Sequence, residues 1–228
     1  MRFGWLTAVV LVSACVANQA TADLVVNYDF SGLSGTPAAV SVAAEHSNVT
    51  ASTLTRGSGI TAVSANNAFE SSGWTTATSV DLNDYYGFTL MPDAGFMMTL
   101  TDISFGEKRD NDGILKFEIR SSLDSFAAAI AGTVTTIGPG SGANTWTFGL
   151  GSAFQDLTTA VGLRIYGYDA DNAGGTWRLQ NFGTNDGLVV NGSVAAVPEP
   201  AAFLFGGMVC SVIGVAAGFR WLKCKKSS

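Results

Sequence analysis

The chain of 228 residues is poor in the residue types from which most catalytic and metal sites are built. It has one histidine, His46, and none of its three cysteines lies between residues 23 and 196. A zinc site with Cys and His ligands is therefore not expected in that segment. Disulfides are not expected there either, so a hydrophobic core must stabilise it. Because no Gly-x-Ser-x-Gly sequence surrounds any serine, an α/β-hydrolase is also excluded.

Charged residues are scarce as well, at 13% of the chain, about half the roughly 25% of an average globular protein. All eighteen acidic residues lie between residues 23 and 199, together with only seven of the twelve Lys and Arg. That segment therefore carries a formal charge of −11, and the other five cations lie near the two ends. A surface this acidic excludes nucleic acid as a partner.

The first residues are typical of a secretory signal peptide. Arg2 precedes a short apolar run, and the small residues Ala20 and Ala22 follow at the spacing that a signal peptidase cleaves. The run is shorter than the about 20 apolar residues of a membrane-spanning helix. We therefore predict a signal peptide over residues 1–22. One alternative is lipidation, because the residues up to Cys15 resemble a bacterial lipobox, and another is a buried N-terminal helix.

The C-terminal segment has three parts in a fixed order. Val197, Pro198, Glu199 and Pro200 come first, residues 201–219 follow without a charge, and the basic residues are Arg220, Lys223, Lys225 and Lys226. A helix over the uncharged part would be roughly 28 Å long, close to the thickness of a hydrocarbon core. The prolines keep the preceding backbone extended, and the cations favour the cytoplasmic side. We therefore predict a single transmembrane helix over residues 201–219.

This arrangement resembles the PEP-CTERM sorting signal of exopolysaccharide-producing bacteria. The resemblance covers about thirty residues at the very end of the chain, and it implies that residues 197–228 are processed by an exosortase. That membrane enzyme would recognise Pro198-Glu199-Pro200 and release or transfer the upstream domain. Trp221, Leu222 and Cys224 interrupt the basic cluster, which departs from a compact arginine run. The alternative is a permanently membrane-anchored protein whose helix is never cleaved.

The segment between the two ends, residues 23–196, has the two-residue hydrophobic period of β-strands. Apolar and other residues alternate over residues 24–30, 115–120, 146–150 and 161–166, and Gly-rich breaks separate these runs. We predict one all-β domain, an antiparallel β-sandwich or jelly roll, with a single helix candidate over Ser122 to Ala131. Residues 120–124, 164–168 and 175–179 also resemble the bodies of other PEP-CTERM proteins, which implies a sandwich without implying an activity.

Two turns are rich in the hard oxygen ligands that calcium prefers. Asp110 and Asp112 belong to the first turn, and Asp169 and Asp171 belong to the second. Neither turn contains the complete twelve-residue calcium loop, and Asp-Asn-Gly turns also serve hairpins that bind no ion. We interpret these four residues as candidate calcium ligands, and expect no other cofactor.

A glycosidase would need only two carboxyl groups that face each other across a cleft. The candidates by residue type are Glu45, Glu70, Glu107 and Glu118. The spacing pairs no two of them, and the alternation predicts that Glu118 lies on a solvated outer face of a strand. His46 lies in a polar stretch that is typical of an exposed loop.

Sugar binding would use exposed aromatic rings with a few polar groups beside them. Trp74, Tyr85, Tyr86 and Trp177 lie in or near loop-like sequence, whereas Trp146 is interpreted as a core residue. The favoured function is that of a secreted or cell-surface, non-catalytic protein, associated with extracellular matrix or exopolysaccharide and sorted by an exosortase. The alternative, besides the permanent anchor, is an enzyme that acts on polysaccharide through an Asp or Glu pair.

Overall fold

The structure, a computed structural model, describes residues 23–138, 142–181 and 187–198. The strands are β1 (Asp23–Tyr28), β2 (Ser34–Gly35), β3 (Ala39–Val40), β4 (Ala44–Glu45), β5 (Val49–Ala51), β6 (Leu54–Arg56), β7 (Thr61–Val63), β8 (Ala68–Ser72), β9 (Tyr85–Pro92), β10 (Phe96–Arg109), β11 (Ile114–Ser121), β12 (Thr135–Thr136), β13 (Ala143–Gly149), β14 (Val161–Ala170), β15 (Trp177–Gln180) and β16 (Leu188–Ala196). Two short 3-10 helices, η1 (Ser122–Asp124) and η2 (Ser152–Phe154), complete the described elements.

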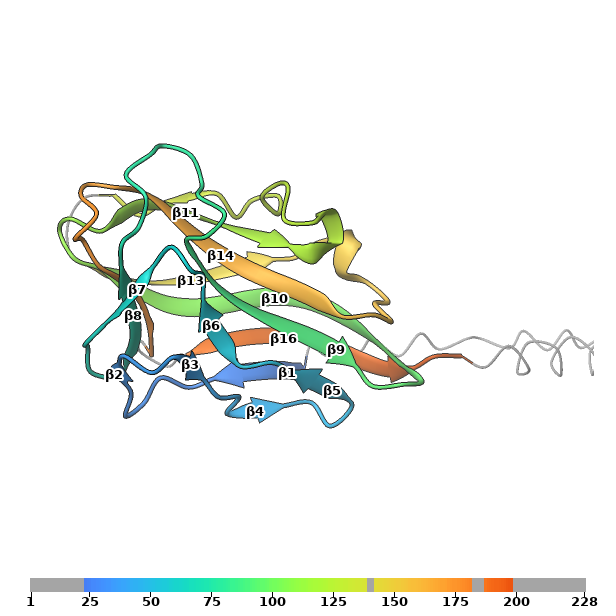
Figure 1. Cartoon of the computed structure of the whole chain (residues 1–228). Helices are drawn as coiled ribbons and strands as arrows, with labels where there is room; N and C mark the ends of the chain where they lie inside the picture. Colours follow the sequence, from blue (N-terminus) through green and yellow to red (C-terminus); the bar gives the residue numbers. More distant parts are fainter. Residues whose placement is uncertain (1–22, 139–141, 182–186, 199–228) are drawn as a thin grey trace, which may run out of the picture.

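The strands form two sheets that pack face to face, as Figure 1 shows. The first sheet has the order β2-β8-β15-β10-β16-β1-β4, with β13 added to β10 and β7 added to β8. The second has the order β12-β11-β14-β9-β6-β3, with β5 added to β9. The predicted all-β sandwich is confirmed. One pairing, between β2 and β8, is parallel, so the sandwich is not purely antiparallel.

The strand alternation gives each sheet a buried inner face. In β14, Val161, Leu163 and Ile165 are fully buried, whereas Arg164 between them is partly exposed on the other face. This is the pattern that a period of two predicts for a half-buried strand. The same inner faces supply one continuous core that spans both sheets.

Aromatic rings join the two sheets at the centre of this core. Trp177 of the first sheet stacks on Phe117 of the second with ring centroids 5.8 Å apart, and its ring also packs on Tyr86 at 5.5 Å. Trp74 lies edge-on to Trp177 at 5.3 Å. Such pairs add to the stability that area burial provides. Trp74, Tyr86 and Trp177, which lie in or near loop-like sequence, have no exposed surface and are therefore not available as sugar-binding rings.

The predicted helix over Ser122 to Ala131 is also wrong. Only η1 is helical, and the two residues after it, Ser125 and Phe126, have φ angles of 61° and 60°. Two successive residues in the left-handed region reverse the chain instead of continuing a helix. Asp124 accepts hydrogen bonds from the backbone N–H groups of Ala127 and Ala128 and so stabilises this reversal.

Most residues of the two predicted signals lie outside the described residues. Residues 1–22, with Cys15, Ala20 and Ala22, lie outside the described residues. Of the sorting motif, Val197 and Pro198 are described, whereas Glu199, Pro200, the predicted helix over residues 201–219, and the cations Arg220, Lys223, Lys225 and Lys226 are not. Within the described ranges, no helix has the length and apolar character needed to span a membrane.

Candidate functional site

The outer face of the second sheet carries a cleft where β9 and β14 lie side by side. The register places Thr89 opposite Gly162, Gly87 opposite Arg164, and Tyr85 opposite Tyr166. Because side chains on one face recur every second residue, these six residues share the face that points away from the core.

The cleft has a volume of about 220 Å³. Its lining includes Ser52, Thr53, Thr55, Tyr85, Thr89, Phe126 and Arg164, together with Gly87, Phe88, Gly162 and Leu163. A Cβ atom on Gly87 would lie 3.0 Å from Cε2 of Tyr85, and one on Gly162 would lie 3.2 Å from Cζ of Phe126. Because these two positions carry no side chain, the rings of Tyr85 and Phe126 can pack directly against the backbone of the strands.

Arg164 is held in this cleft by two aromatic rings. Its guanidinium carbon lies 4.2 Å from the ring centroid of Tyr85 and 3.9 Å from that of Phe126. Both distances are in the range of cation–π attraction. The side chain is also restrained by a hydrogen bond of 3.2 Å from its Nη1 to the hydroxyl of Tyr166, the neighbouring outer-face residue on β14. The guanidinium is therefore positioned before any ligand arrives.

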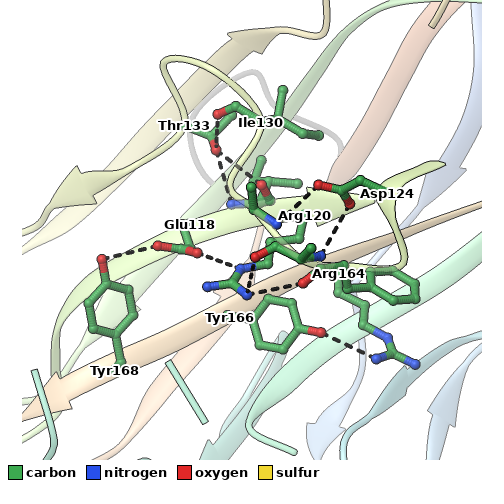
Figure 2. A network of polar contacts seen from close by, with 12 residues as sticks. Glu118, Arg120, Asp124, Ile130, Thr133, Arg164, Tyr166 and Tyr168 are labelled. Atoms are coloured by element: carbon green, nitrogen blue, oxygen red, sulfur yellow. Dashed lines mark hydrogen bonds and ion pairs between the residues drawn. The ribbon is translucent and has the colours of Figure 1, made fainter. Parts of the chain in front are cut away.

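The loop after η1 places Phe126 over the cleft. Its backbone N–H donates to the carbonyl of Ser121, and its own carbonyl accepts a hydrogen bond of 3.0 Å from Nη1 of Arg120. The same Nη1 donates to the carbonyl of Ala127 at 3.2 Å. Figure 2 shows how Arg120 and Asp124 hold this loop from two sides. The left-handed backbone of the loop is thus fixed by charged side chains.

Glu118 fixes Arg120 in turn. Oε1 of Glu118 accepts a hydrogen bond of 2.6 Å from Nε of Arg120, and Oε2 accepts one of 3.3 Å from the hydroxyl of Tyr168 (Figure 2). Burial, followed by the negative charge of Glu118, raises the pKa of Tyr168. The expectation that Glu118 lies on a solvated face is wrong, because it keeps only 7% of its surface exposed. The arginine and the loop that pack around the strand cover it.

The four candidate catalytic glutamates lie apart from the cleft, and none of the described residues that line the cleft is acidic. Glu45, which is exposed, accepts a hydrogen bond from the backbone N–H of Ala51. Glu70 pairs with Arg178 at 3.3 Å, and Glu107 is fully buried. Each of these carboxylates thus has a structural partner in its own part of the molecule.

Glu107 accepts hydrogen bonds at both carboxylate oxygens. Nδ2 of Asn144 lies 2.6 Å from Oε1 and Nε1 of Trp146 lies 3.4 Å from the same atom, while Nε1 of Trp177 lies 2.8 Å from Oε2. Burial nevertheless raises the pKa of Glu107 above its ordinary value, against the lowering effect of these donors. Trp146, interpreted from the sequence as a core residue, is partly buried and packs against the core.

The two acidic turns come together in the structure, because the N–H of Asn172 donates to the carbonyl of Asp112. Two of the four carboxylates are engaged by cations: Asp171 bonds Arg109 at 2.7 Å, and Asp169 bonds Lys116 at 2.9 Å. Asp110 accepts a hydrogen bond from the N–H of Asp112 within its own turn. Among the described residues no three His, Cys, Asp or Glu side chains gather as a metal site. Calcium binding here stays a prediction, and an ion would compete with two basic side chains.

His46 lies in a turn, where its Nδ1 accepts a hydrogen bond of 3.2 Å from the backbone N–H of Asn48. Of the residues that form the cleft, sequence reasoning identified only Tyr85 as a candidate. Arg164 could have been found, because the alternation places it on the outer face of its strand. Phe126 could not, because nothing in the sequence indicates its left-handed backbone.

Comparison with solved structures gives distant similarities, and two of them are described here. No family model and no curated protein matches the sequence. Among solved structures, TmCBM61 in complex with β-1,4-galactotriose is 13% identical, with a TM-score of 0.30, and the match covers 63% of this chain and 88% of that one. The enzymatically active domain of bacteriophage CBA120 tailspike protein 4 is 16% identical, with a TM-score of 0.32, over 64% of this chain and 20% of that one. Both similarities concern the backbone arrangement alone.

Proposed function

We propose that this chain is an exported, non-catalytic surface or matrix protein whose β-sandwich binds extracellular polysaccharide at the outer cleft. The observation that carries the proposal is the lining of the cleft, which combines the ring of Tyr85, the guanidinium of Arg164 and several hydroxyl groups on paired strands. Rings of this kind present an apolar face with polar groups beside it, and hydroxyls both donate and accept hydrogen bonds. A sugar ring offers the complementary surface.

A binding role fits the cleft better than a catalytic one. Glycoside cleavage needs two carboxyl groups that face each other across a cleft, about 5–10 Å apart. None of the described residues in the lining supplies a carboxyl group. The buried Glu70, Glu107 and Glu118 are each bonded to donors elsewhere in the domain.

We further propose that residues 197–228 act as an exosortase sorting signal after a signal peptidase has removed residues 1–22. The order of motif, uncharged stretch and basic cluster supports this proposal. The motif also follows the sandwich directly, because β16 ends at Ala196 and the N–H of Val197 still donates to the carbonyl of Gly95. A processing enzyme would therefore cut close to the folded domain.

Binding can be tested by sedimentation of the full chain with insoluble polysaccharides, in a detergent whose headgroup is not a sugar. Replacing Tyr85 with Ala should lower the retained fraction several-fold, because an aromatic platform is lost. Met91→Ala is the matched control, since Met91 is an exposed residue of the same strand outside the lining. Equal retention of both variants and the wild type would contradict the proposed site, and release of soluble sugars would favour the enzymatic alternative.

Sorting can be tested by mass spectrometry of the mature protein from the producing bacterium. The expected C-terminus lies at or near Pro198-Glu199-Pro200, so that Arg220 to Lys226 are missing. Replacing the three motif residues with Ala should leave the basic tail in place. If the unaltered protein keeps Lys226 in most molecules, the permanently anchored alternative holds instead.

A further inference from the structure

From the charge pattern around the cleft, we infer that its ligand is an acidic polysaccharide and that Arg164 binds the carboxylate of a uronic acid unit. The inference rests on the proposed polysaccharide-binding function and names the class of sugar. It starts from the two arginines that lie opposite each other across β11 and β14, namely Arg120 and Arg164.

Only one of these two arginines has an acidic partner. Arg120 bonds Glu118 at 2.6 Å, and its Nη1 donates to two loop carbonyls. Arg164 forms no ion pair with any residue of the described ranges, although acidic residues outnumber basic ones by eighteen to seven between residues 23 and 199. A partly exposed guanidinium without an acid in so acidic a domain is a place where an external anion can bind.

The contacts of Arg164 leave its N–H groups available. A guanidinium has five N–H donors, and within the described part of the chain the side chain of Arg164 makes one hydrogen bond, to the hydroxyl of Tyr166. The rings of Tyr85 and Phe126 contact the guanidinium carbon and accept no strong hydrogen bond. The remaining donors form a planar edge, which matches the two oxygens of a carboxylate.

The neighbouring groups fit a sugar that carries this carboxylate. Thr55 and Thr89 place hydroxyl groups on the strands beside Arg164, and Tyr85 places a ring there. Because the rings already fix the guanidinium, a ligand does not have to order that side chain, which lowers the entropic cost of binding. None of the described residues of the lining is acidic, and salt screens charges that lie more than about 8 Å away at physiological ionic strength.

The test uses calorimetric titration of the full chain, in a detergent without a sugar headgroup, with α-1,4-linked trigalacturonate and with its neutral counterpart, α-1,4-linked galactotriose. Trigalacturonate should bind about tenfold more tightly or better, since hydrogen bonds to charged groups are the stronger ones. The methyl ester of trigalacturonate, which keeps the sugar and removes the charge, should bind like the neutral trisaccharide. This arm does not depend on the folding of any variant.

On the protein side, Arg164→Gln should abolish the preference for trigalacturonate, so that the variant binds the charged and the neutral trisaccharide with equal affinity. Lys108→Gln is the matched control, because it removes the same charge from a residue of the other sheet outside the cleft. Equal affinity for the charged and neutral trisaccharides in the unaltered chain would overturn the inference while the proposed binding function stands. Binding of neither trisaccharide would overturn the inference for this sugar class, and if sedimentation with every polysaccharide also fails, the proposed function fails with it.

Discussion

Replacement of Glu107 with Gln tests how much the hydrogen bonds of this buried carboxyl group stabilise the sandwich. Both oxygens of the carboxylate accept hydrogen bonds, from Asn144 and Trp146 on one side and from Trp177 on the other. Both oxygens of a carboxyl group can accept hydrogen bonds in either protonation state, whereas a Gln side chain has one acceptor oxygen and one NH₂ group that only donates. The donors on one of the two sides are therefore left without an acceptor. A buried donor without an acceptor costs about 1–3 kcal/mol, and we expect a loss of this size in the free energy of unfolding at pH 5.

The loss of stability that this substitution causes should become smaller as the pH rises. Burial raises the pKa of Glu107 above its ordinary value of 4.5, so the folded state holds this proton more tightly than the unfolded state does. Its contribution to stability is therefore complete below the unfolded pKa and is lost as the pH rises through the folded pKa. Gln carries no titrating group, so the difference in stability between the unaltered chain and the variant should fall from pH 5 to pH 8.

Guanidinium denaturation followed by tryptophan fluorescence measures both effects, because two of the donors are indole groups. Glu45→Gln is the control: it makes the same chemical change on an exposed side chain, and surface changes usually stay within about 0.5 kcal/mol. A Glu107 variant as stable as the unaltered chain at every pH would refute the role of its hydrogen bonds. A constant difference across the pH range would refute the raised pKa.

Two further predictions concern the turns and the loop. Gly175→Ala should destabilise the fold by about 1–3 kcal/mol, because its Cβ would collide with the backbone carbonyl of Asp112. The control variant Gly174→Ala should lower the stability clearly less, because its Cβ meets only the side chain of Asn172, at 3.1 Å. Equal melting temperatures for the two variants would contradict the packing of the two turns. Phe126→Ala should weaken binding of trigalacturonate several-fold with little change in melting temperature, because a partly exposed ring that positions Arg164 is lost. An unchanged affinity in the titration would show that Tyr85 alone is enough to position the guanidinium.

The fold class was predictable because it rests on local alternation. Residues 115–120 and 161–166 alternate cleanly, and both runs form strands of the second sheet. The same rule would also have placed Glu107 correctly, since it follows Ile103 and Phe105 at steps of two and shares their inner face. Residue type alone had instead made it a candidate catalytic carboxyl group. The two-residue period predicts burial better than residue type does when several hydrogen-bond donors surround the buried carboxylate.

The rest depends on contacts between distant residues, which local patterns do not contain. Trp74 and Trp177 adjoin glycine-rich sequence and so resemble loop residues, yet they meet at the centre of the core. The loop after η1 was predicted as a helix because Ala and Phe are compatible with one, and its true course depends on Arg120, an earlier residue on β11. Helix propensity depends only on the residues of the loop itself, so it contains no information about the contact with Arg120.

The energetics of that loop explain why the cleft depends on the partly buried ion pair between Glu118 and Arg120. A non-glycine residue held in the left-handed region costs of order 1–3 kcal/mol, and the loop has two in succession, Ser125 and Phe126. Hydrogen bonds to a charged group contribute about 1.5–3 kcal/mol each, and Arg120 donates two to this loop. The two quantities are of the same size, so the loop keeps its course only while Arg120 is held in place. Glu118, which is only 7% exposed, holds Arg120 in place and thereby decides where Phe126 meets Arg164.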